Sequence, residues 1–324
     1  MVVIVFVCFI LVFGVCGMVE LRVEKARHGA ELYDVLTEAC AGFPEKVQAA
    51  AFKKGIITLN GQQAFGDDIV SEGDIVQIFA PPDAVGADLT PRIVYQDENI
   101  IIVDKPAGLL SASDSGEANA ADMVTAVMKK RGEYSLEALM VPYLIYPLDK
   151  YVSGLLLLAK HEDAYLFLVE ALAQRRIARY FICPVVGYPE KKAELLHYHM
   201  RDKSARVAHI LPKFKKDSKP IVTRYQRLAE GESLSLLRVR PVTNGLHQVR
   251  AHLAFANLPV LGDNIYGNKR YNKKAGAEHI ALWLHKVVFE VGTSHSYSYL
   301  NGMAFESEEC SFPKRVYDEG LLEP

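Results

Sequence analysis

Four consecutive leucines at residues 155–158 constrain the fold of this chain more than any other feature. An uninterrupted apolar run of this length is typical of a strand that is buried on both faces. The polar corner at residues 148–154 precedes it and places one carboxylate, Asp149, at the mouth of the expected strand. A carboxylate held there is more rigid than a surface charge, which suits a catalytic group. Taken alone, these residues fit equally well an aspartate in a turn, with Gly154 as the bend.

The composition indicates a globular protein without a global preference for nucleic acid. The chain has 324 residues, enough for one large and one small domain, and is 50% hydrophobic and 23% charged. Its formal net charge is −2, so no overall positive field attracts RNA or DNA. Residues 197–219, however, contain seven basic and two acidic side chains, a local excess of five positive charges.

The cysteine and histidine spacings argue against disulfides and metal sites. The five cysteines are scattered, odd in number and form no Cys-x-x-Cys pair, which favours a reducing cytosol. His247 and His252 are five residues apart, about 140° around a helix, so they do not share the face that a pair of metal ligands needs. We therefore expect no metal and a cytoplasmic protein.

Residues 1–17 form an apolar segment without lysine or arginine. A signal peptide has a positively charged start, and a membrane helix needs about 20 residues. Three interpretations remain: a start codon assigned too early, a short anchor, or an atypical signal. We favour a true start at Met18, because the chain beyond it has the pattern of a complete protein, and expect no membrane association.

Residues 18–82 have the pattern of a small α+β domain. We expect a first helix around Leu32, Val35 and Leu36, and a second at residues 47–54. A strand at residues 56–59 enters an Asn60-Gly61 turn, a strong hairpin signal, and a second short strand follows at residues 75–78. This order resembles the αL-type RNA-binding domain of ribosomal and RNA-modifying proteins; a generic α+β module is the alternative.

A linker with Pro, Gly and small residues is expected at residues 83–91, before a second domain at residues 92–324. In this domain we expect strands near residues 93–95, 100–103, 155–158, 180–186 and 234–239. Helices are expected around residues 165–172 and 245–256. Because strands outnumber helices and do not alternate strictly with them, the fold class is α+β with a mixed, mainly antiparallel sheet.

Several ordered motifs together resemble the RluA family of RNA pseudouridine synthases. They are Asp97-Glu98-Asn99 with Lys105-Pro106-Ala107-Gly108, Leu148-Asp149 with the run from Ser153 to Leu158, Arg179-Tyr180, and His247-Gln248-Val249-Arg250-Ala251-His252 with Gly262-Asp263 and Tyr266-Gly267. The resemblance covers roughly residues 92–289, and each segment alone would be weak. It implies an isomerisation of uridine in RNA that needs no cofactor. We expect the protein to be a monomer.

The resemblance also implies a role for three residues. Asp149 matches the family's aspartate, which as an ionised carboxylate attacks the flipped-out uridine or stabilises positive charge on it. Arg250 matches the cation that keeps this carboxylate ionised and oriented. Tyr180 matches the aromatic residue that stacks on the base and that can also handle the C5 proton. His285 resembles another family position, for which a structural role is equally consistent.

The sequence departs from the family pattern on the RNA-binding side of the site. Tyr146-Pro147 stands where the family has His-Arg, Val152 replaces a threonine, and residues 244–246 lack an expected arginine. We interpret these differences as altered RNA recognition around intact chemistry. The residues expected to contact RNA are Lys46, Lys53, Lys54, Lys105, Lys150, Lys213, Lys215, Lys216, His247 and Gln248.

The sequence therefore predicts an RNA pseudouridine synthase that acts on structured RNA, ribosomal rather than transfer RNA, with Asp149 as nucleophile. The alternative is a non-catalytic RNA-binding protein on a synthase scaffold, for which Pro147 is the best argument. An unrelated hydrolase with an aspartate nucleophile is disfavoured, because no second carboxylate or base stands in a matching motif.

Overall fold

The chain divides into two units, which the computed structural model describes at residues 4–7, 17–39, 57–80, 91–113, 117–136, 139–202, 204–205, 207–293, 295–308 and 312–322. One unit contains Met1–Thr90 with Gly108–Met123, and the other contains Pro91–Ala107 with Val124–Pro324. The segment Gly108–Met123 therefore groups with the N-terminal unit, whereas we expected residues 92–324 to form one domain. The expected helix at residues 47–54, the linker up to residue 90 and Lys46, Lys53 and Lys54 lie outside the described residues.

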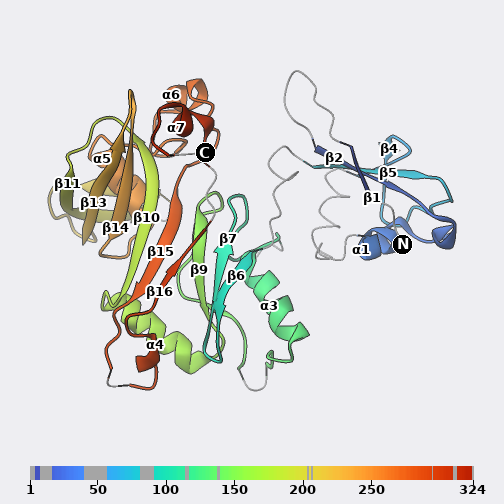
Figure 1. The fold of residues 1–324 in the computed structure, drawn as a ribbon, viewed down its shortest axis with the longest axis horizontal. Helices are drawn as coiled ribbons and strands as arrows, with labels where there is room; N and C mark the ends of the chain where they lie inside the picture. The colour runs from blue at the N-terminus through green and yellow to red at the C-terminus, as the bar shows by residue number, and fades with distance from the viewer. Residues whose placement is uncertain are drawn as a thin grey trace. The chain divides into compact units, whose positions relative to one another are not determined.

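The N-terminal unit contains a five-stranded antiparallel sheet of order β1-β2-β5-β3-β4 (Figure 1). Its elements are β1 (Ile4–Val7), β2 (Gly17–Arg22), α1 (Leu32–Ala39), β3 (Ile57–Leu59), β4 (Gln62–Gln63) and β5 (Ile75–Ala80). Leu32 and Leu36 of α1 pack in one apolar core with Ile57, Val70 and Val76. Strand β1 lies within the apolar segment 1–17 and pairs with β2.

The predicted hairpin is present between β3 and β4. Asn60 and Gly61 both have positive φ angles, 52° and 80°, as the turn of a two-residue hairpin requires. The Asn60 amide also donates to Asp74 and accepts from the backbone of Ile75. The turn residues therefore tie the hairpin to the start of β5.

The larger unit is built on an 11-stranded sheet of order β12-β11-β13-β14-β10-β15-β9-β7-β6, with β8 and β16 beside β9 and β15 (Figure 1). The strands are β6 (Arg92–Gln96), β7 (Ile100–Lys105), β8 (Tyr143–Leu144), β9 (Ser153–Ala159), β10 (Ile177–Val186), β11 (Lys192–Asp202), β12 (Val207–Leu211), β13 (Lys219–Glu230), β14 (Leu234–Pro241), β15 (Trp283–Phe289) and β16 (Ala304–Glu306). Among the described strands of this sheet, only β9 and β15 pair in parallel. The predicted mixed and mainly antiparallel α+β fold is confirmed.

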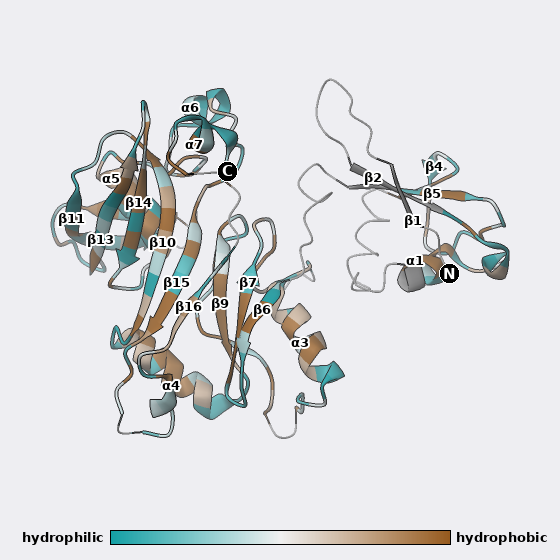
Figure 2. Ribbon diagram, viewed as in Figure 1, coloured by the Kyte–Doolittle hydropathy of each residue, from teal (hydrophilic) through white to brown (hydrophobic). Residues whose placement is uncertain are grey.

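The four leucines form the middle of β9, as predicted. All four, residues 155–158, have an exposed fraction of 0%, and Figure 2 shows this strand as hydrophobic. Gly154 pairs with Leu284 in the parallel contact with β15 and has a φ of 109°. A Cβ atom there would lie 2.2 Å from the carbonyl oxygen of Leu284, so only glycine fits.

The helices are α3 (Ala120–Lys130), which spans the division between the units, α4 (Glu162–Ala173), α5 (Gln248–Phe255), α6 (Lys269–Lys274) and α7 (Lys314–Asp318). Helix α4 packs on β8, β9 and β10, and α5 packs on β12, β13 and β14. Every residue of α5 from Gln248 to Leu253 is buried. This burial fixes the orientation of the helix, and with it the position of Arg250.

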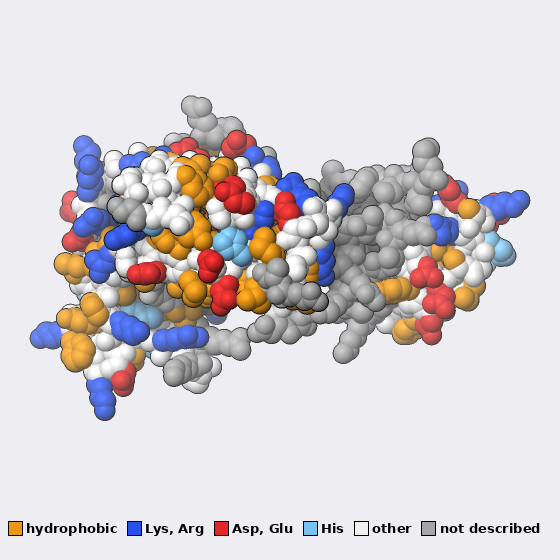
Figure 3. Space-filling view, turned by 90° about the horizontal axis from the view of Figure 1, so that it is seen from below, with side chains coloured by type: hydrophobic (Ala, Val, Ile, Leu, Met, Phe, Trp, Pro, Cys, Tyr) orange, Lys and Arg blue, Asp and Glu red, His pale blue; other side chains and the backbone are white. Residues whose placement is uncertain are grey.

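Charges of both signs are distributed over the surface. On the face shown in Figure 3, Lys and Arg side chains alternate with Asp and Glu side chains, consistent with the small net charge. Within the described ranges, no helix combines the length and the hydropathy that a membrane crossing requires.

Candidate active site

Asp149 lies in the turn between β8 and β9, at the end of β9 that contacts β15. The backbone N–H of Val152 donates to the Asp149 carbonyl at 2.9 Å and closes the turn. Leu148 and Val152 on either side are buried, with exposed fractions of 6% and 2%. The side chain of Asp149 is 35% exposed. The turn thus anchors the backbone on both sides of a carboxylate that solvent and ligands can still reach.

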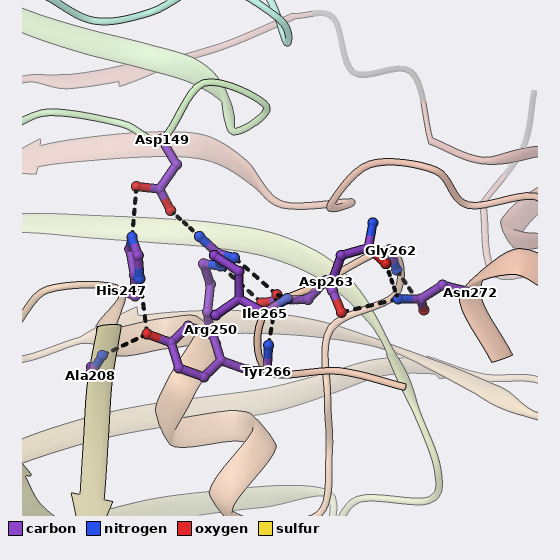
Figure 4. Close-up of polar contacts among 10 residues, drawn as sticks. Asp149, Ala208, His247, Arg250, Gly262, Asp263, Ile265, Tyr266 and Asn272 are labelled. Carbon is purple, nitrogen blue, oxygen red and sulfur yellow. Dashed lines mark hydrogen bonds and ion pairs between the residues drawn. The ribbon is translucent and has the colours of Figure 1, made fainter. Parts of the chain in front are cut away.

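Arg250 of α5 bridges Asp149 and a second carboxylate, Asp263. Its Nη1 donates to Asp149 Oδ2 at 2.6 Å, while Nε and Nη2 donate to the two oxygens of Asp263 at 2.9 Å each (Figure 4). A guanidinium held by two parallel hydrogen bonds has little rotational freedom. The bidentate pair therefore aims an Nη1–H of Arg250 at Asp149.

The loop after α5 holds Asp263 in place. Its Oδ1 also accepts from the backbone N–H groups of Ile265 and Tyr266, at 2.9 and 3.1 Å. The amide of Asn272 donates to the Asp263 carbonyl, and its oxygen accepts from the Gly262 N–H. With a side-chain exposure of 1%, Asp263 is a buried anion whose hydrogen bonds are well satisfied.

His247 forms the other contact of Asp149. It precedes α5 with φ at 49°, and its Nε2 lies 3.4 Å from Asp149 Oδ1. Its Nδ1 lies 2.9 Å from the Tyr266 hydroxyl, which itself accepts from the Ala208 N–H (Figure 4). The Tyr266 proton is therefore available to Nδ1, an arrangement that leaves the proton of a neutral His247 on Nε2, facing Asp149.

These contacts keep both carboxylates ionised. Burial alone raises the pKa of Asp149, but the hydrogen bond from His247 and the charge of Arg250 outweigh it and lower the pKa below the usual range. Asp263 shows the same balance, with burial opposed by the Arg250 hydrogen bonds and charge, and its pKa is also lowered. For Arg250, burial is outweighed by the two carboxylates, so its pKa is raised.

Asp149 opens onto a cavity of about 510 Å³, large enough for a nucleoside-sized group. Its walls come from the segment before β9, the end of α4, strands β10 and β11, and the start of α5. The lining includes Tyr146, Pro147, Leu148, Asp149, Val169, Leu172, Arg179, Phe181, Arg201, Asn244, His247 and Arg250. The cavity joins an ionised carboxylate to apolar walls, with two further arginines beside it.

Tyr180 does not line this cavity. It lies instead with Arg224, Arg238 and Arg240 in another depression, where its hydroxyl accepts from Arg240 at 3.3 Å. Adjacent residues of a strand point to opposite faces of the sheet, so the neighbouring Phe181 faces the cavity. This placement corrects the expectation that Tyr180 stacks on the base.

Two residues expected to contact RNA are occupied inside the protein. Lys105 has an exposed fraction of 0%, and its ammonium donates to the carbonyls of Pro106 and Lys150. The buried Gln248 amide donates to Val222 and Thr223. Lys105 does not reach the surface, so the expectation for it is corrected. Gln248 lines the cavity, but its amide is already hydrogen-bonded inside the protein.

The other expected RNA contacts have different placements. His247 lines the cavity as a partner of Asp149. Lys150, which follows Asp149 directly, is exposed. Lys213, Lys215 and Lys216 are exposed in the loop between β12 and β13. His285 has a buried Nδ1 without a hydrogen-bond partner and a pKa lowered chiefly by burial.

The sequence-based interpretation assigned no role to Asp263, Tyr266 or Arg179, although the motifs it used contain them. Their sequence position could have indicated a role only for Asp263 and Tyr266, which follow Arg250 within 20 residues. Among the described residues, no group of three or more His, Cys, Asp or Glu side chains is arranged as metal ligands.

Comparisons with known proteins identify relatives of this chain. A family model described as RNA pseudouridylate synthase matches residues 99–255. "Ribosomal large subunit pseudouridine synthase D" of Xylella fastidiosa is 27% identical over 272 residues, covering 82% of this chain and 80% of the relative. "Ribosomal large subunit pseudouridine synthase C" of Vibrio cholerae is 23% identical, with 82% and 87% covered, and that of Rickettsia typhi is 28% identical, with 80% and 86% covered.

A solved structure, "Human RNA Pseudouridylate Synthase Domain Containing 4", has the same fold, with a TM-score of 0.56 and 20% identity over 70% of this chain and 92% of that one. The family model and the relatives thus place the chain among the RNA-modifying isomerases of the pseudouridine synthase class. Within that class, the chain belongs to the RluA-type family of RNA pseudouridine synthases.

Proposed function

We propose that this enzyme converts a uridine of large-subunit ribosomal RNA to pseudouridine, with Asp149 as the nucleophile. The observation that carries the proposal is the ionised Asp149 carboxylate, held by Arg250 and His247 at the edge of a cavity of about 510 Å³. The choice of ribosomal RNA is supported by the relatives, which are named for the large ribosomal subunit.

The proposed reaction needs only groups of this chain. A uridine flipped out of its RNA helix enters the cavity, and Asp149 attacks it. The N1–C1′ bond breaks as a bond from the Asp149 carboxylate to C1′ forms, and the base turns within the cavity. The carboxylate is then displaced as the C5–C1′ bond forms. The hydrogen on C5 leaves as a proton and N1 takes up a proton, so atoms and charge balance.

Phe181 is proposed as the aromatic surface that holds the base while it turns. It lines the cavity with Asp149, and an aromatic ring can stack on the flat face of uracil without a directional bond. Because the Phe181 ring carries no hydroxyl, Phe181 cannot accept the C5 proton.

RNA outside the cavity is proposed to contact the loop between β12 and β13. Lys213, Lys215 and Lys216 are exposed there, and Phe214 between them is 68% exposed. Cations interleaved with an exposed aromatic ring are typical of surfaces that contact RNA backbone and unpaired bases. We also propose residues 18–82 as an αL-type RNA-binding domain, supported by the hairpin and by α1.

The test uses ribosomal RNA labelled with tritium at C5 of uridine, from cells that lack this gene. Forming the new bond releases the C5 hydrogen, so tritium in water reports the reaction. We expect release by the native protein and by the control Asp163→Asn, an exposed aspartate of α4, but not by Asp149→Asn. RNA binding without release by the native protein would indicate a non-catalytic RNA-binding protein instead.

A further inference from the structure

Arg179 of β10 is one of the two arginines that line the cavity of Asp149 besides Arg250; the other is Arg201. The guanidinium carbon of Arg179 lies 5.0 Å from the centroid of the Tyr146 ring, and one N–H donates to the side-chain oxygen of Asn244. Its Nε is buried and has no hydrogen-bond partner. The planar group is therefore held on one face by an aromatic ring and on one edge by an amide.

No described carboxylate lies within ion-pair distance of Arg179, in contrast to Arg250, which has two. Burial accordingly lowers the pKa of Arg179. Withdrawing a guanidinium from water costs free energy that a nearby anion can offset. The protein thus keeps a partly buried cation, with an unpaired Nε, in the same cavity as Asp149 and supplies no described carboxylate for it.

Tyr146, the ring that contacts Arg179, is anchored close to the proposed nucleophile Asp149. The buried Tyr146 hydroxyl donates to the Leu155 carbonyl of β9 at 3.2 Å, and Tyr146 precedes Asp149 by three residues. The Asn244 amide in turn donates to the Leu172 carbonyl at the end of α4 at 3.3 Å. An anion bound to Arg179 would therefore occupy a defined position relative to Asp149.

From this geometry we infer that Arg179 binds a backbone phosphate next to the flipped uridine. The inference rests on the proposed function, since the anion is part of the RNA substrate. A phosphate accepts from guanidinium N–H groups, and the planar fork suits it better than a point charge would. Arg179 thereby supplies a cation on the RNA side of a site in which residue 147 is a proline.

The experiment measures the salt dependence of RNA binding for Arg179→Met and Arg179→Lys. Each phosphate contact contributes roughly 0.7 to 0.9 to the slope of log affinity against log salt. We expect Arg179→Met to lower the slope by about one contact and the affinity at low salt by about tenfold. Arg179→Lys should keep the slope, because it keeps the charge.

The matched control is Arg238→Met. The Arg238 side chain is exposed and donates to Gln226. It lines the same depression as Tyr180 and Arg240, not the cavity of Asp149. We choose methionine because an apolar residue of similar length often replaces a buried charge without loss of stability. A glutamine variant, Arg179→Gln, provides a second measurement if the methionine variant does not fold.

A slope for folded Arg179→Met or Arg179→Gln equal to that of the native protein would overturn the inference and leave Arg179 as a structural tie between β10 and residue 244. Equal losses in Arg179→Met and Arg238→Met would overturn it as well. Tritium release by the native protein tests the proposed function independently of the salt slope. An active native enzyme with an unchanged Arg179→Met slope rejects only the phosphate contact, whereas an inactive native protein rejects the proposed function whatever the slope.

Discussion

At the scale of single residues, the neighbours Tyr180 and Phe181 show how one position along a strand decides which side chain meets the substrate. The resemblance to the family predicted the tyrosine, but the phenylalanine lines the cavity. Side-chain alternation separates two such residues only when one face of the strand is polar. In β10, residues on both faces are apolar and mostly buried. The sequence pattern therefore could not indicate which of the two residues faces the cavity.

This assignment predicts different results for two conservative substitutions. Phe181→Leu keeps an apolar side chain but removes the ring, and we expect it to slow tritium release by about tenfold, because base stacking is worth about 1–3 kcal/mol. Tyr180→Phe should leave the rate unchanged. The measurement is kcat for tritium release with the folded state checked by circular dichroism. A slow Tyr180→Phe enzyme beside a fast Phe181→Leu enzyme would restore the original assignment.

Lys105 gives a prediction for stability against pH. Burial, opposed by the charge of Asp149, lowers its pKa from 10.5 to about 7 in the folded protein. Between pH 7 and pH 10.5 the unfolded chain binds a proton that the folded protein does not, so this group makes the free energy of unfolding rise with pH across that window.

Lys105→Met should remove this contribution. The variant should therefore gain stability relative to the native protein near pH 7, and this gain should shrink toward pH 10, as measured by urea unfolding at several pH values. Lys150→Met, at an exposed position, is the control. Parallel stability profiles for Lys105→Met and the native protein would show that Lys105 is charged in both states.

At the scale of elements, the junction of β9 and β15 determines where Asp149 stands. The two strands approach so closely at Gly154 that a methyl group would overlap the Leu284 carbonyl. Gly154→Ala should lower the free energy of unfolding by more than about 3 kcal/mol, since it combines a positive φ with a backbone clash.

Gly292→Ala is the matched control for this junction. Gly292 also has a positive φ, 85°, but nothing lies within 4 Å of its Cβ position, so only the conformational cost of about 1 kcal/mol is expected. Thermal unfolding of both variants measures the difference. Equal losses would mean that the close approach of β9 and β15 adds nothing to the requirement for glycine.

The elements that the sequence predicted well are those with a strong local pattern. The four leucines of β9, the Asn60-Gly61 turn, α4 and β14 all appear where expected. The start of α5 was less accurate, because His247 leaves the helical conformation to face Asp149. That deviation depends on a carboxylate far away in the sequence, which no local pattern reveals.

At the scale of the whole molecule, the fold class follows from the abundance of strands, but the order of strands in the sheet does not. Strand β15 lies between β9 and β10, although it follows both in the sequence by more than 90 residues. Arg179 and Asp263 come together with Asp149 only through such pairings. The site could therefore be predicted in part, through Asp149 and Arg250, and not in its supporting residues.

The charge distribution of the molecule predicts where RNA affinity depends on salt. The triple variant Lys213→Gln, Lys215→Gln and Lys216→Gln should lower the salt slope of RNA binding by up to about 2 to 3. A triple variant of α6, Lys269→Gln, Lys273→Gln and Lys274→Gln, removes the same charge from exposed positions elsewhere. Filter binding over a range of salt concentrations compares them. Equal slopes for the two variants would mean that net charge, and not the β12–β13 loop, determines affinity.

The distance between Asp149 and Arg250 along the chain also has a consequence for folding. The two residues are 101 positions apart, and β10 to β14 lie between β9 and its parallel partner β15 in the sequence. Contacts of such long range form slowly, because closing a long loop costs entropy before it is stabilised. During refolding, enzyme activity should therefore return later than helix and strand signals do, so the recovery of catalysis marks the completion of the central sheet.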